Sequence, residues 1–210
     1  MIEVIDNVLE DHTAILIDDY VKNLSWKFDY KSQKGQPNKH WHVFCGHNKK
    51  ECDESGFDWA HLLFESAKNK IGKELFYGRV YCNAHTHGVE PHLHKDEGEF
   101  TIIFYPRLDW KQEWNGGTLI DGQLVEYVGN RLVVFTAHLP HKAMPVSREC
   151  YELRTCVVFK CHGPWAMYEL KDYLNAINHT KEKLMDTEDE QWEKKYPPFI
   201  VNKCLSGFQD

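Results

Sequence analysis

The sequence predicts a mainly β protein in which α-helices flank a compact β core at about residues 76–160. Two observations predict this fold class. Short runs rich in β-branched and aromatic residues recur throughout that region, with Gly, Pro, Asn and Asp between them. Helical patterns of apolar residues occur before and after it. Strands at this spacing are typical of an all-β sandwich or barrel.

Six runs in the core predict strands. They share a high content of Val, Ile, Thr, Phe and Tyr, the residues that favour a pleated, half-buried surface. In chain order they are LFYGRVYCNA, EFTIIFYP, GTLID, QLVEYV, RLVVFTA and ELRTCVVFK.

The N-terminal region, residues 1–75, is predicted to support this core. Its first 26 residues predict a short strand and then a helix, with one face formed by Leu16, Tyr20, Val21 and Leu24. Residues 27–56 are rich in Gly, Lys, Asn and Ser and have little periodicity, so we expect mostly loop. The run DWAHLLFESAKNKIGKEL predicts a second helix, capped by Asp58 and ending near Gly72.

The C-terminal extension, residues 161–210, returns to a helical pattern. WAMYELKDYLNAINHTKEKLM predicts a helix, and the charged stretch after it is broken by Pro197 and Pro198. No pattern requires a second domain, so we expect one domain over residues 1–210.

The composition is that of a folded protein. The chain has 210 residues, 42% of them hydrophobic, which is enough to form a core. No run approaches the length of a membrane span. Seven cysteines without a framework spacing, and an acidic start without a signal-like apolar run, predict a cytoplasmic protein with reduced thiols.

The charge of the chain bears on its partners. A formal net charge of −7 argues against general binding to nucleic-acid phosphates, which requires clustered Lys and Arg. A small molecule or a peptide is the expected substrate, and no membrane partner is expected. The sequence contains no indication of the oligomeric state.

Three residues have side chains that could together bind a metal ion. On a strand, the i, i+2 spacing of His94 and Asp96 directs both side chains to one face. A chain with 13 histidines contains such a triplet by chance, so a third ligand is needed. His141, in TAHLPHKAMPV, follows an apolar strand and precedes a Pro-Val turn. Two imidazoles and one carboxylate form a facial triad, which suits iron(II). His92 and His138 are rival ligands.

A cationic side chain lies on the last predicted strand of the core. Arg154 is placed in an otherwise apolar run, where an unpaired charge is unfavourable unless an anion accompanies it. Its donor fork suits the far carboxylate of a bidentate 2-oxo acid. Tyr105 could donate to the same carboxylate, although a core aromatic role is nearly as well supported. Arg148, in a polar turn-like stretch, is the rival anchor.

The order of these motifs resembles the iron(II)/2-oxoglutarate dioxygenases, and most of all their prolyl 4-hydroxylase-like branch. The resemblance covers roughly residues 76–160, with a weaker echo in VIDNVLED. Each motif is weak, but their ordered spacing is specific. The motifs are His94-Lys95-Asp96, FYPRLDWKQEWNGGTLI, VGNRLVVF, HKAMPV and LRTCVVFK.

The resemblance implies a double-stranded β-helix (jelly-roll) core and a hydroxylase that uses O₂ and releases succinate and CO₂. It implies iron(II) held by His94, Asp96 and His141, with 2-oxoglutarate held by Arg154. Tyr105 lies five residues before Trp110, where related oxygen-sensing prolyl hydroxylases place a tyrosine that binds 2-oxoglutarate. The substrate could instead be a free amino acid, a metabolite or a nucleobase. A non-catalytic β-barrel metal-binding protein is the alternative from another class.

Two features depart from the family pattern. The interval between His141 and Arg154 is longer than in several relatives. Many relatives also have a tyrosine just upstream of the first histidine, where this chain offers Tyr81, Asn83 and His85 without a settled register.

Three further groups have a functional and a structural interpretation. Trp110 and Trp114 could line a substrate groove or pack in the core, and Gly116-Gly117 indicates a close approach at a strand entrance. A zinc site is the functional interpretation of one histidine- and cysteine-rich group, and a loop covering the active site is the other. Its members are His40, His42, Cys45, His47 and Cys52.

Overall fold

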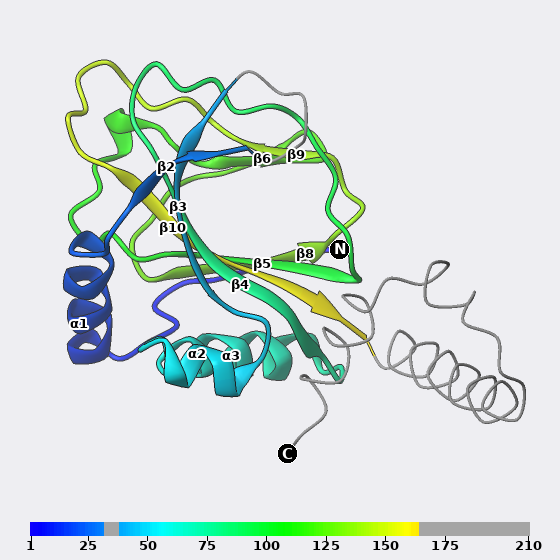
Figure 1. Ribbon diagram of the computed structural model, residues 1–210. Coiled ribbons are helices and arrows are strands. Elements are labelled where there is room, and N and C mark those ends of the chain that lie inside the picture. Colours follow the sequence, from blue (N-terminus) through cyan, green and yellow to red (C-terminus); the bar gives the residue numbers. More distant parts are fainter. Residues whose placement is uncertain (32–37, 164–210) are drawn as a thin grey trace, which may run out of the picture. The chain divides into compact units, whose positions relative to one another are not determined.

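The computed structural model of the chain describes residues 1–31 and 38–163 (Figure 1). Met1–Gly163 forms one compact unit. The helix and the charged stretch predicted after it lie outside the described residues. The prediction of one domain over residues 1–210 therefore stays a prediction.

The larger of two antiparallel sheets has seven strands in the order β1-β8-β5-β10-β4-β3-β2. Its strands are β1 (Ile2–Ile5), β2 (Lys27–Tyr30), β3 (His40–Gly46), β4 (Phe76–His85), β5 (Phe100–Tyr105), β8 (Arg131–Thr136) and β10 (Arg154–His162). β10 lies at the centre, paired with β4 on one side and β5 on the other.

The smaller sheet has the order β7-β6-β9 and lies across from the larger one (Figure 1). It consists of β6 (Thr118–Ile120), β7 (Gln123–Val125) and β9 (His141–Ala143), and a short 3₁₀ helix, η1 (Gln112–Trp114), precedes it. Ile120 and Val125 join Ile103 and Val158 of the larger sheet in one apolar cluster between the sheets. Two antiparallel sheets enclosing a common interior confirm the predicted mainly β, jelly-roll fold.

Three helices cover the outer face of the larger sheet: α1 (Asp11–Lys22), α2 (Lys49–Glu54) and α3 (Ala60–Ile71) (Figure 1). Val157 and Phe159 of β10 pack in the apolar cluster on this helical side, whereas Cys156 and Val158 belong to the interior cluster. This alternation follows from the two-residue period of a strand. Arg154 and Lys160 share the parity of Val158, so their side chains enter the interior between the sheets.

Residues 27–56 do not form mostly loop, as predicted, because they contain β2, β3 and α2. β3 is defined by pairing, since Trp41 to Phe44 lie opposite Ala84 to Tyr81 of β4. Partner strands supply the backbone hydrogen bonds that local sequence does not indicate.

Details of two predicted helices also differ. The side chains of α1 that are buried are Ala14, Ile17, Asp18 and Val21. Leu16 is 57% exposed, so the buried face of the helix differs from the predicted one. In α3 the N-terminal cap is Trp59, without a side-chain hydrogen bond, so Asp58 does not cap the helix. Gly72 ends α3 with a φ of 66°, as predicted for a left-handed C-terminal cap.

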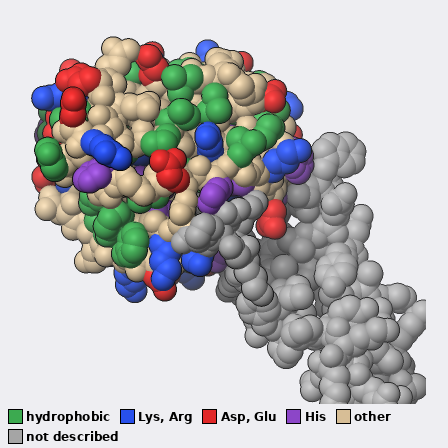
Figure 2. Space-filling model, turned by 90° about the horizontal axis from the view of Figure 1, so that it is seen from above, with side chains coloured by type: hydrophobic (Ala, Val, Ile, Leu, Met, Phe, Trp, Pro, Cys, Tyr) green, Lys and Arg blue, Asp and Glu red, His purple; other side chains and the backbone are tan. Residues whose placement is uncertain are grey.

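In the described part of the face in Figure 2, Lys and Arg side chains are interspersed with acidic and apolar ones. Among the described residues, no helix combines the length and the apolar character that crossing a membrane requires.

Candidate metal centre and anion pocket

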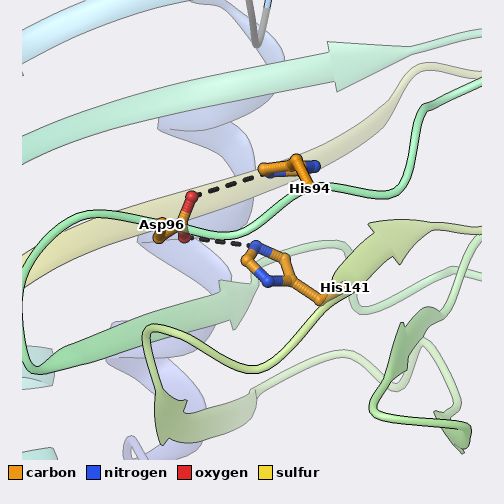
Figure 3. A group of neighbouring side chains, drawn as sticks. All are labelled: His94, Asp96 and His141. Atoms are coloured by element: carbon orange, nitrogen blue, oxygen red, sulfur yellow. Dashed lines mark ion pairs between the residues drawn. The ribbon is translucent and has the colours of Figure 1, made fainter.

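The structure brings the side chains of His94, Asp96 and His141 together (Figure 3). His94 and Asp96 lie in the extended segment before β5, and His141 is the first residue of β9. His94 and His141 exchange backbone hydrogen bonds of 3.0 and 2.8 Å, and the Asp96 amide donates to Ala137. One nitrogen or oxygen from each side chain lies within 4.8 Å of the others. This is the only such group among the described residues.

Backbone carbonyls orient both imidazoles. Nδ1 of His94 donates to the carbonyl of His92 at 2.9 Å, and Nδ1 of His141 donates to the carbonyl of Leu139 at 2.8 Å. A carbonyl can only accept, so each neutral ring carries its proton on Nδ1 and presents an unprotonated Nε2. Both Nε2 atoms face the Asp96 carboxylate, at 3.6 and 3.2 Å (Figure 3). The three side chains therefore converge as metal ligands do.

The Asp96 carboxylate is ionised despite its burial. Burial alone would raise its pKa, but the charge of Lys160 and its hydrogen bond to the carboxylate lower the pKa below its ordinary value. Lys160 forms an ion pair with Oδ2, and the hydroxyl of Thr101 donates to the same oxygen at 2.7 Å. Burial lowers the pKa of His94, which favours the neutral ring. The group therefore offers the Asp96 anion and, at His94, a neutral imidazole.

The rival histidines lie elsewhere. His138 is exposed in the turn after β8, whereas His141 is 3% exposed. Nε2 of His92 contacts the side-chain amide of Asn38 at 3.3 Å, and its carbonyl orients His94. His92 thus contributes a backbone acceptor beside the centre.

Arg154 is almost completely buried, with 1% of its surface exposed. Nε donates to the carbonyl of Gly116 at 2.6 Å, and Nη1 lies 3.3 Å from the thiol of Cys156. Its guanidinium carbon is 5.5 and 5.6 Å from the ring centres of Tyr105 and Tyr127. No carboxylate among the described residues forms an ion pair with it. The rival, Arg148, is exposed on a turn.

A hydroxyl network lies beside this guanidinium. The Oγ1 atom of Thr118 accepts from the Tyr105 hydroxyl at 2.6 Å and from Nη2 of Arg154 at 3.4 Å. A hydroxyl with both acceptor positions occupied still has its own proton to donate. The Thr118 hydroxyl proton is therefore free to form a further hydrogen bond beside Arg154, and the hydrogen bond from Tyr105 orients this hydroxyl.

Strand β6 connects the surroundings of Arg154 with the His94, Asp96 and His141 group. Ile120 is the register partner of His141, and Thr118, two residues earlier, contacts Arg154. Residues two apart share a strand face and are separated by roughly 7 Å. Both groups therefore face one interior, at a separation that a short dicarboxylate spans.

Solved structures of several oxygenases share this arrangement of strands. The chain has the fold of the iron(II)/2-oxoglutarate oxygenases. It superposes on a 2OG-Fe(II) oxygenase family oxidoreductase from Burkholderia pseudomallei with a TM-score of 0.58 and 13% identity, over 77% of this chain and 84% of that one.

Two other structures with the oxygenase fold have known ligands or a named activity. A prolyl-4-hydroxylase from Pseudomonas putida matches with a TM-score of 0.52 and 16% identity, over 76% of this chain and 91% of that one. HygX from Streptomyces hygroscopicus, with nickel, 2-oxoglutarate and hygromycin B bound, matches at 0.57 and 10%, over 78% and 83%. No family model and no curated protein matches the sequence.

The histidine- and cysteine-rich group of β3 and α2 is divided between two faces within this oxygenase fold. Cys45 and Cys52 lie in the apolar cluster beneath the helices, with the Cys45 thiol 3.8 Å from that of Cys82. His42 is on the opposite face, where Nδ1 contacts the side chain of Asn83 at 2.9 Å. These side chains do not come together as a zinc site would require, and most of the segment forms β3 and α2 instead of a loop.

The strand upstream of the first histidine contributes three interior residues. His85 is the register partner of Arg154, and Asn83 and Tyr81 follow at two-residue steps along β4. His85 is 7% exposed, and its Nδ1 has no hydrogen-bond partner among the described residues. Burial holds its pKa well below the ordinary value, so the ring is neutral.

Trp110 and Trp114 pack against each other, with ring centres 5.2 Å apart. Trp110 is 9% exposed and donates from Nε1 to the carbonyl of Asn115 at 2.8 Å. Both therefore have packing roles near Gly116, and substrate contact by either stays a prediction.

The sequence analysis did not identify two residues that line the interior. Tyr127 stacks on Tyr105 with ring centres 4.4 Å apart, and Lys160 pairs with Asp96. The position of Lys160 at an even step from Arg154 on one strand was the available signal for its orientation.

Proposed function

We propose that the protein is an iron(II)- and 2-oxoglutarate-dependent dioxygenase that hydroxylates a peptide or a small molecule. One observation carries the proposal. A buried, permanently charged guanidinium has no carboxylate partner among the described residues, and it faces the interior that holds a His, Asp, His cluster. A buried cation is unfavourable without an anion, so Arg154 indicates a site for an anionic ligand.

The ligand atoms fit iron(II). Two imidazole nitrogens and one carboxylate are the donors of the facial triad that leaves coordination positions for other ligands. His94 and His141 would bind through Nε2, because each Nδ1 proton is engaged by a carbonyl. Asp96 would bind through one oxygen while Lys160 and Thr101 hold the other.

The interior also fits 2-oxoglutarate. Arg154 would bind the far carboxylate, with Thr118 as a second donor. The walls around these groups include Phe135, whose ring centre is 4.7 Å from that of His141, and Val158. Such walls exclude water and hold the cosubstrate in one orientation.

When bound, iron(II) and 2-oxoglutarate supply the oxidation of a C–H bond by O₂, with release of succinate and CO₂. The protein contributes orientation. Carbonyls hold the Nδ1 protons of His94 and His141, Lys160 keeps Asp96 ionised, and Arg154 determines the direction of the cosubstrate chain. The activity named for the Pseudomonas putida structure and the hygromycin B bound by HygX support peptide and small-molecule substrates as the two classes to test.

Anaerobic addition of iron(II) and 2-oxoglutarate tests the proposal. We expect the weak visible metal-to-ligand band of a chelated 2-oxo acid. Arg154→Ala is expected to weaken 2-oxoglutarate binding by roughly a hundredfold, because loss of a buried charged partner costs about 2–5 kcal/mol. Arg148→Ala, which removes an exposed arginine, is the matched control and should bind as the wild type does.

Two results would contradict the proposal. Absence of the band from the wild-type protein would exclude a chelated cosubstrate. Iron binding that does not depend on 2-oxoglutarate, with no succinate formed from any substrate, would instead indicate a non-catalytic metal-binding barrel.

A further inference from the structure

Besides Arg154, a pair of cations lies on the face of the larger sheet that points to the interior. Arg79 of β4 and Lys160 of β10 are direct register partners, so their side chains leave the sheet on the same face. Lys160 lies six residues beyond Arg154, which is roughly 20 Å along the strand. Its contact with Asp96 places the pair beside the metal ligands.

Both cations lie over the ring of Tyr81. The guanidinium carbon of Arg79 is 4.9 Å from the ring centre, and Nζ of Lys160 is 5.9 Å from it. Tyr81 is 6% exposed, so these contacts form in a largely dry environment.

The negative charge beside this pair is limited. Like charges directly opposite one another destabilise a sheet unless an anion accompanies them. Among the described residues, Asp96 forms an ion pair with Lys160, and none forms one with Arg79. Nε of Arg79 is buried and has no hydrogen-bond partner there.

Loading the centre increases the imbalance. This step rests on the proposed function. Iron(II) would bring two positive charges to Asp96, and the two carboxylates of 2-oxoglutarate would be engaged by the metal and by Arg154. The positive charges of Arg79 and Lys160 would then exceed the negative charge available beside them. An excess of positive charge of this kind favours the binding of an additional anion.

Aromatic side chains connect the pair to the partly exposed residues Tyr30 and His42. Tyr30 stacks on His42 with ring centres 3.9 Å apart, and His42 lies 5.2 Å from Tyr81. Tyr30, His42 and Arg79 are partly exposed, whereas Tyr81 is buried. The row therefore runs from the surface to the side of the metal ligands occupied by Lys160.

We propose that the substrate carries an oxyanion, a carboxylate or a phosphate, that binds between Arg79 and Lys160. Arg79 supplies an unoccupied Nε donor and a guanidinium fork, and Lys160 supplies the second charge. The rest of the substrate would lie along the Tyr30–His42–Tyr81 row. Arg79 is then a specificity-determining residue, distinct from the residues that hold the cosubstrate.

Binding of small oxyanions to the loaded protein tests this proposal. The protein is saturated with nickel(II) and 2-oxoglutarate, which does not turn over, and titrated calorimetrically with acetate and with methylphosphonate. Saturable binding is expected for at least one, and the preferred probe distinguishes a carboxylate from a phosphate substrate. Arg79→Gln should weaken that binding roughly tenfold or more, because a hydrogen bond to a charged group contributes about 1.5–3 kcal/mol.

Matched variants distinguish a loss of charge at residue 79 from an effect on folding. Arg79→Lys should retain part of the affinity, and Arg148→Gln, at an exposed position, should retain all of it. The visible iron–2-oxoglutarate band of Arg79→Gln should equal that of the wild type. A thermal melt monitors folding.

Three outcomes would overturn the proposal while the proposed function stands. They are a normal band without oxyanion binding, binding unchanged in Arg79→Gln, and binding that occurs only when 2-oxoglutarate is left out of the titration. The last would place the probe at Arg154. Absence of the band in the wild type would instead contradict the dioxygenase function itself.

Discussion

The two ends of β10 present buried cations in different settings. Arg154 is surrounded by uncharged groups, namely the carbonyl of Gly116, the hydroxyl of Thr118 and the rings of Tyr105 and Tyr127. Lys160 instead forms an ion pair with Asp96. Arg154 has no carboxylate partner among the described residues, whereas Lys160 stabilises a carboxylate of the candidate metal centre. Burial alone therefore does not indicate which cation lacks compensation, because a carboxylate beside the cation offsets the cost of burying its charge.

The largest expected effect concerns the end that contains Asp96. His141→Ala removes a ligand whose Nε2 faces the carboxylate, so iron(II) affinity should fall by more than about a hundredfold, the upper range for losing an outer-shell partner. His138→Ala is the control, because this neighbour is exposed. Equilibrium dialysis measures both. Equal iron(II) affinities in the two variants would show that His141 is not a ligand.

The comparison between the two cations is tested by replacing each with methionine in the metal-free protein. Lys160→Met leaves Asp96 without its cationic partner and should lower the free energy of unfolding by about 3 kcal/mol. Arg154→Met removes a cation that has no internal counterion and should change it by less than about 1 kcal/mol. Urea unfolding measures both. A larger loss for Arg154→Met would show that its hydrogen bonds outweigh its missing counterion.

Acid should destabilise the metal-free protein through His40. Burial, reinforced by the nearby His42, lowers the pKa of His40 to about 4, against 6.5 in the unfolded chain. Between these values the unfolded state binds more protons, so the free energy of unfolding falls as the pH decreases from 6.5 to 4. The contribution is at most about 3 kcal/mol. His40→Gln should reduce the difference in stability between pH 7 and pH 4.5, and an unchanged difference would contradict this assignment.

The smallest effect concerns the hydroxyl beside Arg154. Tyr105→Phe removes the donor that orients Thr118 but leaves the guanidinium in place. The affinity for 2-oxoglutarate should fall roughly threefold to tenfold, as for one neutral hydrogen bond. A titration of the visible band measures it. A loss as large as that of Arg154→Ala would mean that Tyr105 contacts the cosubstrate directly.

The core strands were predicted well because β-branched and aromatic residues recur in short runs that Gly, Pro, Asn and Asp separate. The run RLVVFTA illustrates this, since it corresponds to β8. β3 was missed because HWHVFCG has little apolar periodicity and becomes a strand by pairing with β4. β9 is three residues long, and its hydrogen bonds to β6 are not visible in local composition.

The same division applies to the candidate site. His94, Asp96, His141 and Arg154 could be proposed from their order along the chain, and the structure brings the first three together. Their roles as ligands and anchor stay predictions. The Arg79–Lys160 pair could not be proposed, because it depends on the register between β4 and β10, which has an irregularity just beyond Lys160.

The sequence by itself determined the chemistry available and the parity of side chains along each strand, which are local properties of residue type and backbone geometry. Only the tertiary structure decided which of the 13 histidines meet and which cation has a carboxylate beside it. Those outcomes depend on strand register, and register is determined when the apolar faces of distant segments are buried together. The hydrogen bonds between His94 and His141 are one result of that burial.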